Sequence, residues 1–335
     1  MNASILAIRL RSMGDVLFTR PAVRAIREAF PDAKITFLTS LQNAPLIQGF
    51  RDVEETITLD YDRFRGANPF VIVRETLSLV RRLRAGNFSF VVDFQGFGET
   101  AFLSWCTGAA QRWGNVYAAG RKWAYTHSAQ RNDRIHPAEW NLSLLKQCGL
   151  QVGNPANEFV LPAQAIEEAR RFFSALVPDP ARPVLFIQPL TSTPCKNWPL
   201  DRYLATAAHW RSHGIQPLFG GGPADRPALE VVRQAGFPVS AGAPLLTNAG
   251  LMQLSALVLG GDTGLLHLAV AMGKRVVMIK DFQTECYPFR HPEWAATPPA
   301  GRGGPLLSID TNQVIEACAR GFADAGVRSS YLTSR

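Results

Sequence analysis

The sequence has few cysteines and no motif built from them. Its cysteines are widely scattered along the 335 residues, with no Cys-x-x-Cys pair: Cys106, Cys148, Cys195, Cys286 and Cys318. This odd, dispersed set excludes a disulfide-built scaffold and fits a reducing compartment. No group of His, Cys and carboxylate residues has the spacing of metal ligands, so we expect no metal. Paired Cys/His fingers and aromatic-rich RNA-binding motifs are also absent, and we expect no nucleic-acid partner.

The sequence also lacks an uninterrupted hydrophobic run long enough for a membrane span. The longest apolar tract, Leu251–Met272, is broken by Asp262 and His267. The apolar run Ile5–Ile8 starts almost at once and is followed by arginine, which predicts a first β-strand rather than a signal peptide. We therefore expect a cytoplasmic protein, with peripheral membrane contact left open.

The composition is that of an ordinary globular protein with an excess of positive charge. Apolar residues make up 47% and charged residues 19%, and the formal net charge is +8. A chain of this length exceeds the size at which single cores stop growing, so we expect two domains. Basic residues and aromatics mix in the first half, which predicts either a solvated face or a surface for phospholipid headgroups or a phosphorylated glycolipid: Arg81, Arg82, Arg84, Arg112, Arg121, Lys122, Arg131, Arg134, Trp113, Tyr117, Trp123 and Tyr125.

Strand and helix patterns alternate twice along the chain. Short apolar runs separated by helical periodicity indicate parallel sheets covered on both faces. The runs in the first half are Ile5–Leu10, Lys34–Thr39 and Phe88–Phe94. After a Gly/Pro-rich stretch, the second half shows strands at Val184–Gln188, Gln216–Phe219 and Arg275–Ile279, with helices at Leu200–Ser212, Leu251–Leu257 and Leu265–Met272. The sequence predicts two doubly wound α/β domains, residues 1–165 and 166–335.

Two short turns, one in each half, carry the most chemistry. Arg11–Asp15 and Gly261–His267 each follow a predicted buried strand and lead into a helix, which is where α/β proteins hold anionic ligands. Pro21 suits the start of a helix, so we expect an irregular turn from Asp15 to Arg20. Asp15 is either a helix cap or a general base that takes a proton from an attacking hydroxyl.

The second turn favours a diphosphate. The amide groups of Thr263 and Gly264, with the Thr263 hydroxyl, suit phosphate oxygens at a helix N-terminus. Phosphate would repel Asp262, which more plausibly holds a hydroxyl, a sugar ring or the loop itself. His267 is either a core residue or a hydrogen-bond donor to the diphosphate.

Two further loops follow predicted strands of the second half. Thr191, Ser192 and Lys196 offer hydroxyl groups and a point charge for phosphate, although an exposed loop lysine needs no ligand. A glycine-rich turn leads to Asp225, whose carboxylate could accept hydrogen bonds from ribose hydroxyls. A Rossmann dehydrogenase is disfavoured, because the first turn lacks the spaced glycines of a dinucleotide fingerprint.

Taken together and in order, these segments resemble the bacterial heptosyltransferases of lipopolysaccharide core synthesis, glycosyltransferase family 9. The matching pieces are Ile8–Val16 with Pro21-Ala22, Asp93–Gly96, Lys196–Pro199, and Asp262–Gly264 with His267–Ala269. The resemblance implies a GT-B fold of two facing Rossmann-like domains with a cleft between them. It also implies inverting transfer of a heptose from ADP-L-glycero-D-manno-heptose to a lipid-linked acceptor, with no metal and no separate cofactor.

The resemblance assigns roles residue by residue. Asp15 would be the general base, and Lys196 would offset the charge that develops on the leaving diphosphate. The first domain would bind an anionic glycolipid acceptor, and the second a nucleotide-sugar donor, with contact at the cytoplasmic face of the inner membrane left open. Expected donor residues are Thr191, Ser192, Lys196, Asp225, Asp262, Thr263, Gly264 and His267; expected acceptor residues are Gly14, Gln95, Arg121 and Lys122.

The sequence departs from the family pattern at three places. Gly261 stands where the family often has Asn, and Gln188–Leu190 replaces a His-Pro-Gly-like turn. Lys280–Gln283 replaces the customary Gly-Pro-Thr segment near the donor. Two alternatives therefore stay open: a family member with another nucleotide sugar or a non-lipopolysaccharide acceptor (capsule, O-chain or protein), and a non-catalytic nucleotide-sugar-binding protein.

Overall fold

The chain folds into two compact units that divide between Val160 and Leu161. The computed structural model describes residues 3–64 and 68–332. The predicted boundary between residues 165 and 166 falls inside helix α7 (Ala163–Leu176), which lies wholly in unit 2.

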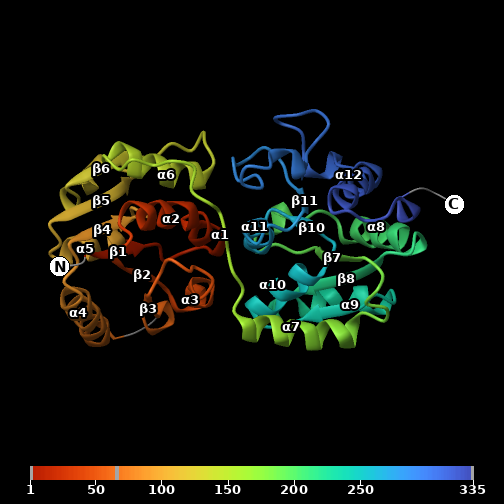
Figure 1. Ribbon diagram of the computed structural model, residues 1–335, viewed down its shortest axis with the longest axis horizontal. Coiled ribbons are helices and arrows are strands. Elements are labelled where there is room, and N and C mark those ends of the chain that lie inside the picture. The colour runs from red at the N-terminus through yellow and green to blue at the C-terminus, as the bar shows by residue number, and fades with distance from the viewer. Residues whose placement is uncertain (1–2, 65–67, 333–335) are drawn as a thin grey trace. The chain divides into compact units, whose positions relative to one another are not determined.

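Unit 1 is built on a parallel six-stranded sheet in the order β3-β2-β1-β4-β5-β6 (Figure 1). The strands are β1 (Ser4–Ile8), β2 (Lys34–Ser40), β3 (Glu55–Leu59), β4 (Phe90–Asp93), β5 (Gln111–Val116) and β6 (His127–Gln130). The helices are α1 (Met13–Leu17), α2 (Arg20–Ala29), α3 (Ala44–Ile47), α4 (Pro69–Ala85), α5 (Gly98–Cys106) and α6 (Pro137–Gln147).

Burial of the central strands on both faces organises unit 1. Ile5–Ile8 in β1 is fully buried, as expected for an apolar run in a parallel sheet. Leu83 of α4 and Leu103 of α5 pack with β-strand residues in one apolar cluster, so these helices cover one face. Helices α2 and α6 pack together on the other side of the sheet (Figure 1).

Unit 2 repeats this architecture with the strand order β12-β11-β10-β7-β8-β9 (Figure 1). The strands are β7 (Val184–Gln188), β8 (Gln216–Gly221), β9 (Val239–Ala241), β10 (Leu257–Gly261), β11 (Val276–Ile279) and β12 (Ala295–Ala296). Helices α8 (Leu200–Ser212), α9 (Arg226–Gln234) and α12 (Thr311–Asp324) share one apolar cluster with the sheet; α7 packs on α10 (Leu245–Leu254), which also contacts α11 (Gly264–Ala271).

The strand order places one switch point in each sheet. In unit 1 the chain leaves β1 on one side and returns at β4 on the other; in unit 2 the corresponding neighbours are β7 and β10. The crevice outside the carboxyl ends of such strands is where open α/β sheets bind ligands. Asp15 follows β1, and Asp262 follows β10, so each carboxylate lies at a switch point.

One prediction of local structure was wrong. Leu251–Leu257 is not one helix: α10 ends at Leu254, Ser255 is extended, and Leu257 opens the buried strand β10. Most of this stretch is apolar, and a short, mostly apolar run does not distinguish a helix from a strand. The irregular turn expected between Asp15 and Arg20 is short: α1 ends at Leu17, Phe18 and Thr19 form a turn, and α2 begins at Arg20 with Pro21 second.

Within the part of the chain that the structure describes, no helix is both long and apolar enough to cross a membrane.

Candidate functional site

The turn after β1 presents a carboxylate held by a buried cation. Arg9 Nη2 lies 2.5 Å from Asp15 Oδ2. The Arg9 side chain is 9% exposed and that of Asp15 is 32% exposed, so the carboxylate is the accessible member of the pair. Asp15 does not cap α1, whose N-cap is Ser12 without a side-chain bond. The cap interpretation of Asp15 is therefore wrong.

Backbone strain marks the same turn. Ser12 adopts φ 64° and ψ 119°, a left-handed φ that residues with a side chain rarely adopt. Such conformations cost about 1–3 kcal/mol and persist only where the surroundings hold them. Gln95 supplies part of that support, since its Oε1 accepts hydrogen bonds from the backbone N–H groups of Leu10 (2.9 Å) and Arg11 (3.1 Å).

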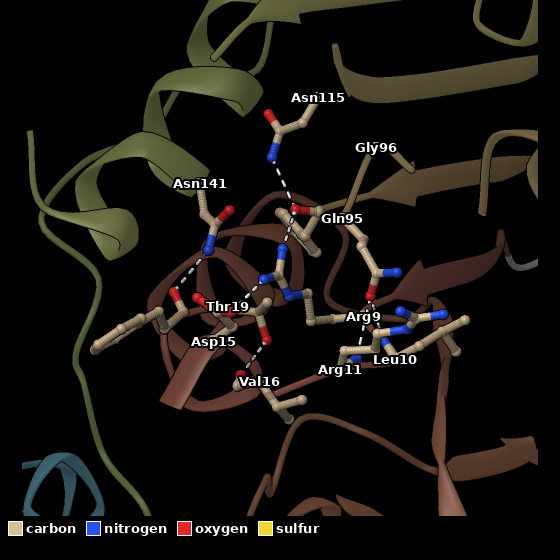
Figure 2. A network of polar contacts seen from close by, with 12 residues as sticks. Arg9, Leu10, Arg11, Asp15, Val16, Thr19, Gln95, Gly96, Asn115 and Asn141 are labelled. Atoms are coloured by element: carbon tan, nitrogen blue, oxygen red, sulfur yellow. Dashed lines mark hydrogen bonds and ion pairs between the residues drawn. The ribbon is translucent and has the colours of Figure 1, made fainter. Parts of the chain in front are cut away.

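A buried polar network fixes Arg9 from the neighbouring strands (Figure 2). Arg9 Nη1 donates to the Phe94 carbonyl at 3.0 Å, and Asn115 Nδ2 donates to the same oxygen at 2.9 Å. Asp93 accepts from the N–H groups that follow β4, and burial raises the pKa of its carboxyl. The segment Asp93–Gly96, quoted above as a family motif, thus acts by positioning the Arg9–Asp15 pair.

The structure brings most of the predicted acceptor residues together. Gly14 lies in α1 beside Asp15, and Gln95 supports the turn from the loop that follows β4. Arg121 Nη1 donates to the Gly96 carbonyl at 2.9 Å, which places its guanidinium next to this network; Lys122 follows it and is exposed. Gln95 is fully buried, so its side chain contributes by holding the turn.

A cavity beside the turn adds residues that the sequence analysis missed. It has a volume of about 590 Å³ and is lined by Leu10, Arg11, Ser12, Met13, Ser40, Gln42, Asn43, Tyr61, Asp62 and Phe64. The Arg11 guanidinium lies 4.8 Å from the centre of the Tyr61 ring and pairs with Glu99 at 3.0 Å. Arg11 is part of the turn Arg11–Asp15 noted in the sequence, but nothing in the sequence connects it to Tyr61, which follows β3.

The turn after β10 has the opposite arrangement. Asp262 Oδ2 accepts from Lys196 Nζ at 2.8 Å, and its Oδ1 lies 3.1 Å from His267 Nε2. The side chains of Asp262 and His267 are 10% and 5% exposed, whereas Lys196 is 30% exposed. Here the carboxylate is buried, and the cation is the accessible member.

The pKa values follow from these contacts. Burial alone would raise the pKa of Asp262, but the hydrogen bonds and charges of His267 and Lys196 outweigh it and lower that pKa well below its usual range. Burial likewise opposes the charge on Lys196, yet the bond to Asp262 raises its pKa. Asp262 therefore holds the loop, one of the roles expected for it, and Lys196 is not a free loop lysine.

The N-terminus of α11 borders this cluster. Thr263 is the N-cap of the helix, and its hydroxyl oxygen accepts from Leu266 N–H at 3.3 Å. A hydroxyl that accepts one bond keeps its own proton for a second partner. Thr263 and Gly264 are both partly exposed, so the amides of this turn are accessible to an anion.

The loop after β7 packs closely on β10. Thr191 Oγ1 donates to the Thr193 carbonyl at 2.7 Å, and Asn197 Oδ1 accepts from Thr191 N–H at 2.8 Å; Ser192 is exposed. A Cβ added to Gly261 would lie 2.9 Å from Thr191 Cγ2. This close approach gives a local reason for glycine at a position where the family often has Asn.

Asp225 lies apart from the cluster, after β8. Its Oδ2 accepts from Gly222 N–H at 2.8 Å, so the carboxylate shapes the glycine-rich turn, and it remains partly exposed. Since β8 neighbours β7, this turn and the Lys196 loop follow adjacent strands at the same edge of the sheet.

Lys280 is a further cation beside the second turn. It lines one small cavity with Lys196 and Asp262, and only 2% of it is exposed. Its Nζ donates to the carbonyls of Asp281 (2.8 Å) and Thr284 (2.9 Å), and burial lowers its pKa. In the sequence, this segment stands out only as a departure from the family pattern. A lysine directly after an apolar strand was the available signal.

Comparison with known proteins supports the predicted fold and family. The model of "Glycosyltransferase family 9 (heptosyltransferase)" matches residues 76–279. Lipopolysaccharide heptosyltransferase 3 of Escherichia coli is 26% identical over 282 residues, which cover 81% of this chain and 80% of that protein.

Solved structures agree on the fold. The glycosyltransferase family 9 structure from Veillonella parvula has a TM-score of 0.84 at 20% identity and covers 97% of this chain and 99% of its own. The E. coli heptosyltransferase WaaC with ADP-2-deoxy-2-fluoro heptose has a TM-score of 0.76 at 21% identity, with coverage of 95% and 99%. The predicted GT-B fold class is confirmed. The resemblance noted in the sequence is confirmed as well, and the chain belongs to glycosyltransferase family 9.

Proposed function

We propose that this glycosyltransferase transfers a heptose from ADP-L-glycero-D-manno-heptose to the inner core of lipopolysaccharide, with inversion at the anomeric carbon. The names of its relatives support the choice, since the curated ones are lipopolysaccharide heptosyltransferases and WaaC has been solved with an ADP-heptose analogue. The observation that carries the proposal is the accessible Lys196 ammonium, held by buried Asp262 beside the N-terminus of α11.

Unit 2 is the donor-binding unit in this proposal. An ammonium, a helix N-terminus and loop hydroxyls suit the two phosphates of a nucleoside diphosphate. Lys196 would offset the negative charge that grows on the departing ADP, with Thr191, Ser192, Thr263 and Gly264 on the same phosphates. Asp262 and His267 would keep Lys196 in place, and Asp225 would accept from a ribose hydroxyl.

Unit 1 is the acceptor-binding unit. Asp15 would remove the proton of the attacking hydroxyl, and Arg9 would hold the carboxylate in one orientation. Gly14, Gln95, Arg121 and Lys122 would bind or shape the acceptor site, and the cavity lined by Arg11 and Tyr61 offers an aromatic ring and a cation to an anionic sugar. Inverting displacement needs a base and a leaving-group cation as separate groups, and the two units would supply one each.

A donor panel tests this function. Purified protein is given ADP-heptose, ADP-hexoses and uridine- or guanosine-linked sugars, with core oligosaccharide as acceptor, and nucleoside diphosphate release is measured. We expect release from ADP-heptose and an inverted anomeric configuration in the product by NMR. Release only from another donor would support the alternative of a family member with a different nucleotide sugar, which the altered Lys280–Gln283 segment suggests. Tight donor binding without turnover on any acceptor would indicate a non-catalytic binding protein.

A further inference from the structure

Large apolar side chains gather on the surface of one part of unit 1. Helix α4 exposes Phe70, Ile72, Val73 and Leu77, of which Phe70 is 76% exposed. Phe70, Val73 and Leu77 follow a spacing of three and four residues, so they form a stripe along one side of the helix. Leu79, Val80 and Leu83, in the C-terminal half of the same helix, pack into the core cluster of unit 1. Helix α4 therefore carries large apolar side chains toward solvent as well as toward the core.

An aromatic patch lies on the neighbouring elements. Phe102 and Trp105 of α5 and Trp123 of the 3₁₀ segment Ala119–Ala124 are 41%, 49% and 57% exposed. The rings of Trp105 and Trp123 lie 5.9 Å apart, and those of Phe102 and Trp105 lie 6.5 Å apart. Helix α5 contacts both α4 and this 3₁₀ segment, and Arg84 Nε donates to the Cys106 carbonyl across the α4–α5 junction. The stripe and the patch therefore lie on adjoining elements.

The charges around these apolar groups are nearly all positive. Helix α4 carries one acidic residue, Glu75, and α5 carries one, Glu99. The basic residues on the three elements are Arg74, Arg81, Arg82, Arg84, Arg121 and Lys122. Arg74, Arg81 and Arg84 share the side of α4 that bears the stripe, as their spacing shows. Large exposed apolar side chains flanked by arginine match the interface of an anionic bilayer, where the ring and aliphatic groups enter the headgroup layer and guanidinium groups meet phosphate.

We propose that α4 and the adjoining Phe102–Trp105–Trp123 patch bind the surface of a bilayer that contains anionic phospholipid. This surface goes beyond the proposed transfer reaction, because it recognises phospholipid rather than donor or acceptor. Unit 2 offers no comparable face in its described residues, where the large exposed apolar side chains are dispersed over different elements: Phe172, Val231 and Leu307.

Flotation with vesicles tests the proposal on the full chain without donor or acceptor. Wild-type protein is mixed with phosphatidylcholine vesicles, with or without phosphatidylglycerol. We expect binding only to the anionic vesicles, weakened by high salt. The triple variant Phe70→Ser/Val73→Ser/Leu77→Ser should lower partitioning at least about tenfold. The variant Arg74→Gln/Arg81→Gln should lower it roughly 25-fold, at about fivefold for each of the two cations near an anionic surface.

A matched control and a second readout keep the result interpretable. Val231→Ser/Leu307→Ser removes exposed apolar groups from unit 2 and should leave partitioning unchanged. Thermal melts and transfer to a core oligosaccharide freed of its acyl chains should match wild type for both apolar variants, which separates lipid binding from catalysis. The proposal is overturned if wild type ignores anionic vesicles, if the control loses as much as the triple variant, or if the triple variant instead dissociates a dimer of this chain.

Discussion

The two turns look alike in sequence but present opposite charges. Each follows a central strand, bears a carboxylate and opens a helix. At the first, Arg9 is buried and Asp15 faces outward; at the second, Asp262 is buried and Lys196 faces outward. The member of each ion pair that reaches solvent is the one that can meet a substrate.

This difference separates two roles that composition cannot distinguish. An accessible carboxylate suits proton removal, whereas an accessible ammonium suits a phosphate. The buried partner in each case fixes the geometry and keeps the outward group in one place. We therefore expect variants of the outward groups to change function and variants of the buried groups to change stability as well.

Removal of the outward carboxylate should have the largest effect. Asp15→Asn keeps the size of the side chain and a hydrogen-bond acceptor for Arg9 but cannot take a proton. We expect kcat for heptose transfer to fall about 10²–10⁴-fold. ADP release at saturating substrates measures it, with Asp32→Asn, an exposed turn carboxylate, as the control. A kcat for Asp15→Asn equal to that of Asp32→Asn would remove Asp15 from the reaction.

Removal of the outward cation, Lys196, should have the second-largest effect. Lys196→Met would lose the proposed charge-assisted contact to the donor, which is worth roughly 1.5–3 kcal/mol, so we expect kcat/KM for the donor to fall about 10–100-fold. Lys146→Met, an exposed lysine of α6, serves as the control. Donor kinetics identical in both variants would show that Lys196 does not touch the diphosphate.

Replacement of the buried carboxylate tests the supporting role through pH. The pKa of Asp262 is lowered in the folded state, so its contribution to stability is present above the unfolded value of about 3.9 and is lost as pH falls below it. Asp262→Asn should destabilise the protein by roughly 2–3 kcal/mol at neutral pH. Its loss of stability on acidification should be smaller than that of wild type. Urea unfolding at neutral and acidic pH measures both, and parallel pH profiles would contradict the assignment.

The smallest effect is expected at the buried cation Lys280. Burial lowers its pKa, so the unfolded chain binds the proton more readily, and stability rises as pH climbs from the folded pKa toward about 10.4. Lys280→Met should lack that rise and change stability at neutral pH by about 1 kcal/mol or less. If Lys280→Met weakens donor binding as strongly as Lys196→Met does, the exposure of the side chain does not decide which cation binds phosphate.

Local structure could be predicted from the sequence where the hydrophobic periodicity and the positions of glycine and proline agreed on where an element ends. The predicted bounds of Val184–Gln188 and Leu200–Ser212 are those of β7 and α8. The prediction of one helix over Leu251–Leu257 failed because short, mostly apolar runs occur in both buried helices and buried strands.

The site could be predicted only as a set of residues. Lys196 and Asp262 were both expected near the donor, but their ion pair joins positions 66 residues apart and depends on β7 and β10 being neighbours. Arg9 lies in the matching segment Ile8–Val16 but had no predicted role, since an arginine at the end of an apolar strand gives no sign of its partner. Spacing along the chain reveals which groups follow strands, while burial of one partner comes only from the packed sheet.

Titration of ADP into Asp15→Asn and Lys196→Met by calorimetry tests the central claim most directly. If the outward groups have separate roles, Asp15→Asn binds ADP with the wild-type Kd, and Lys196→Met binds it at least about tenfold more weakly. Equal weakening in both variants, or an unchanged Kd in Lys196→Met, would contradict the account.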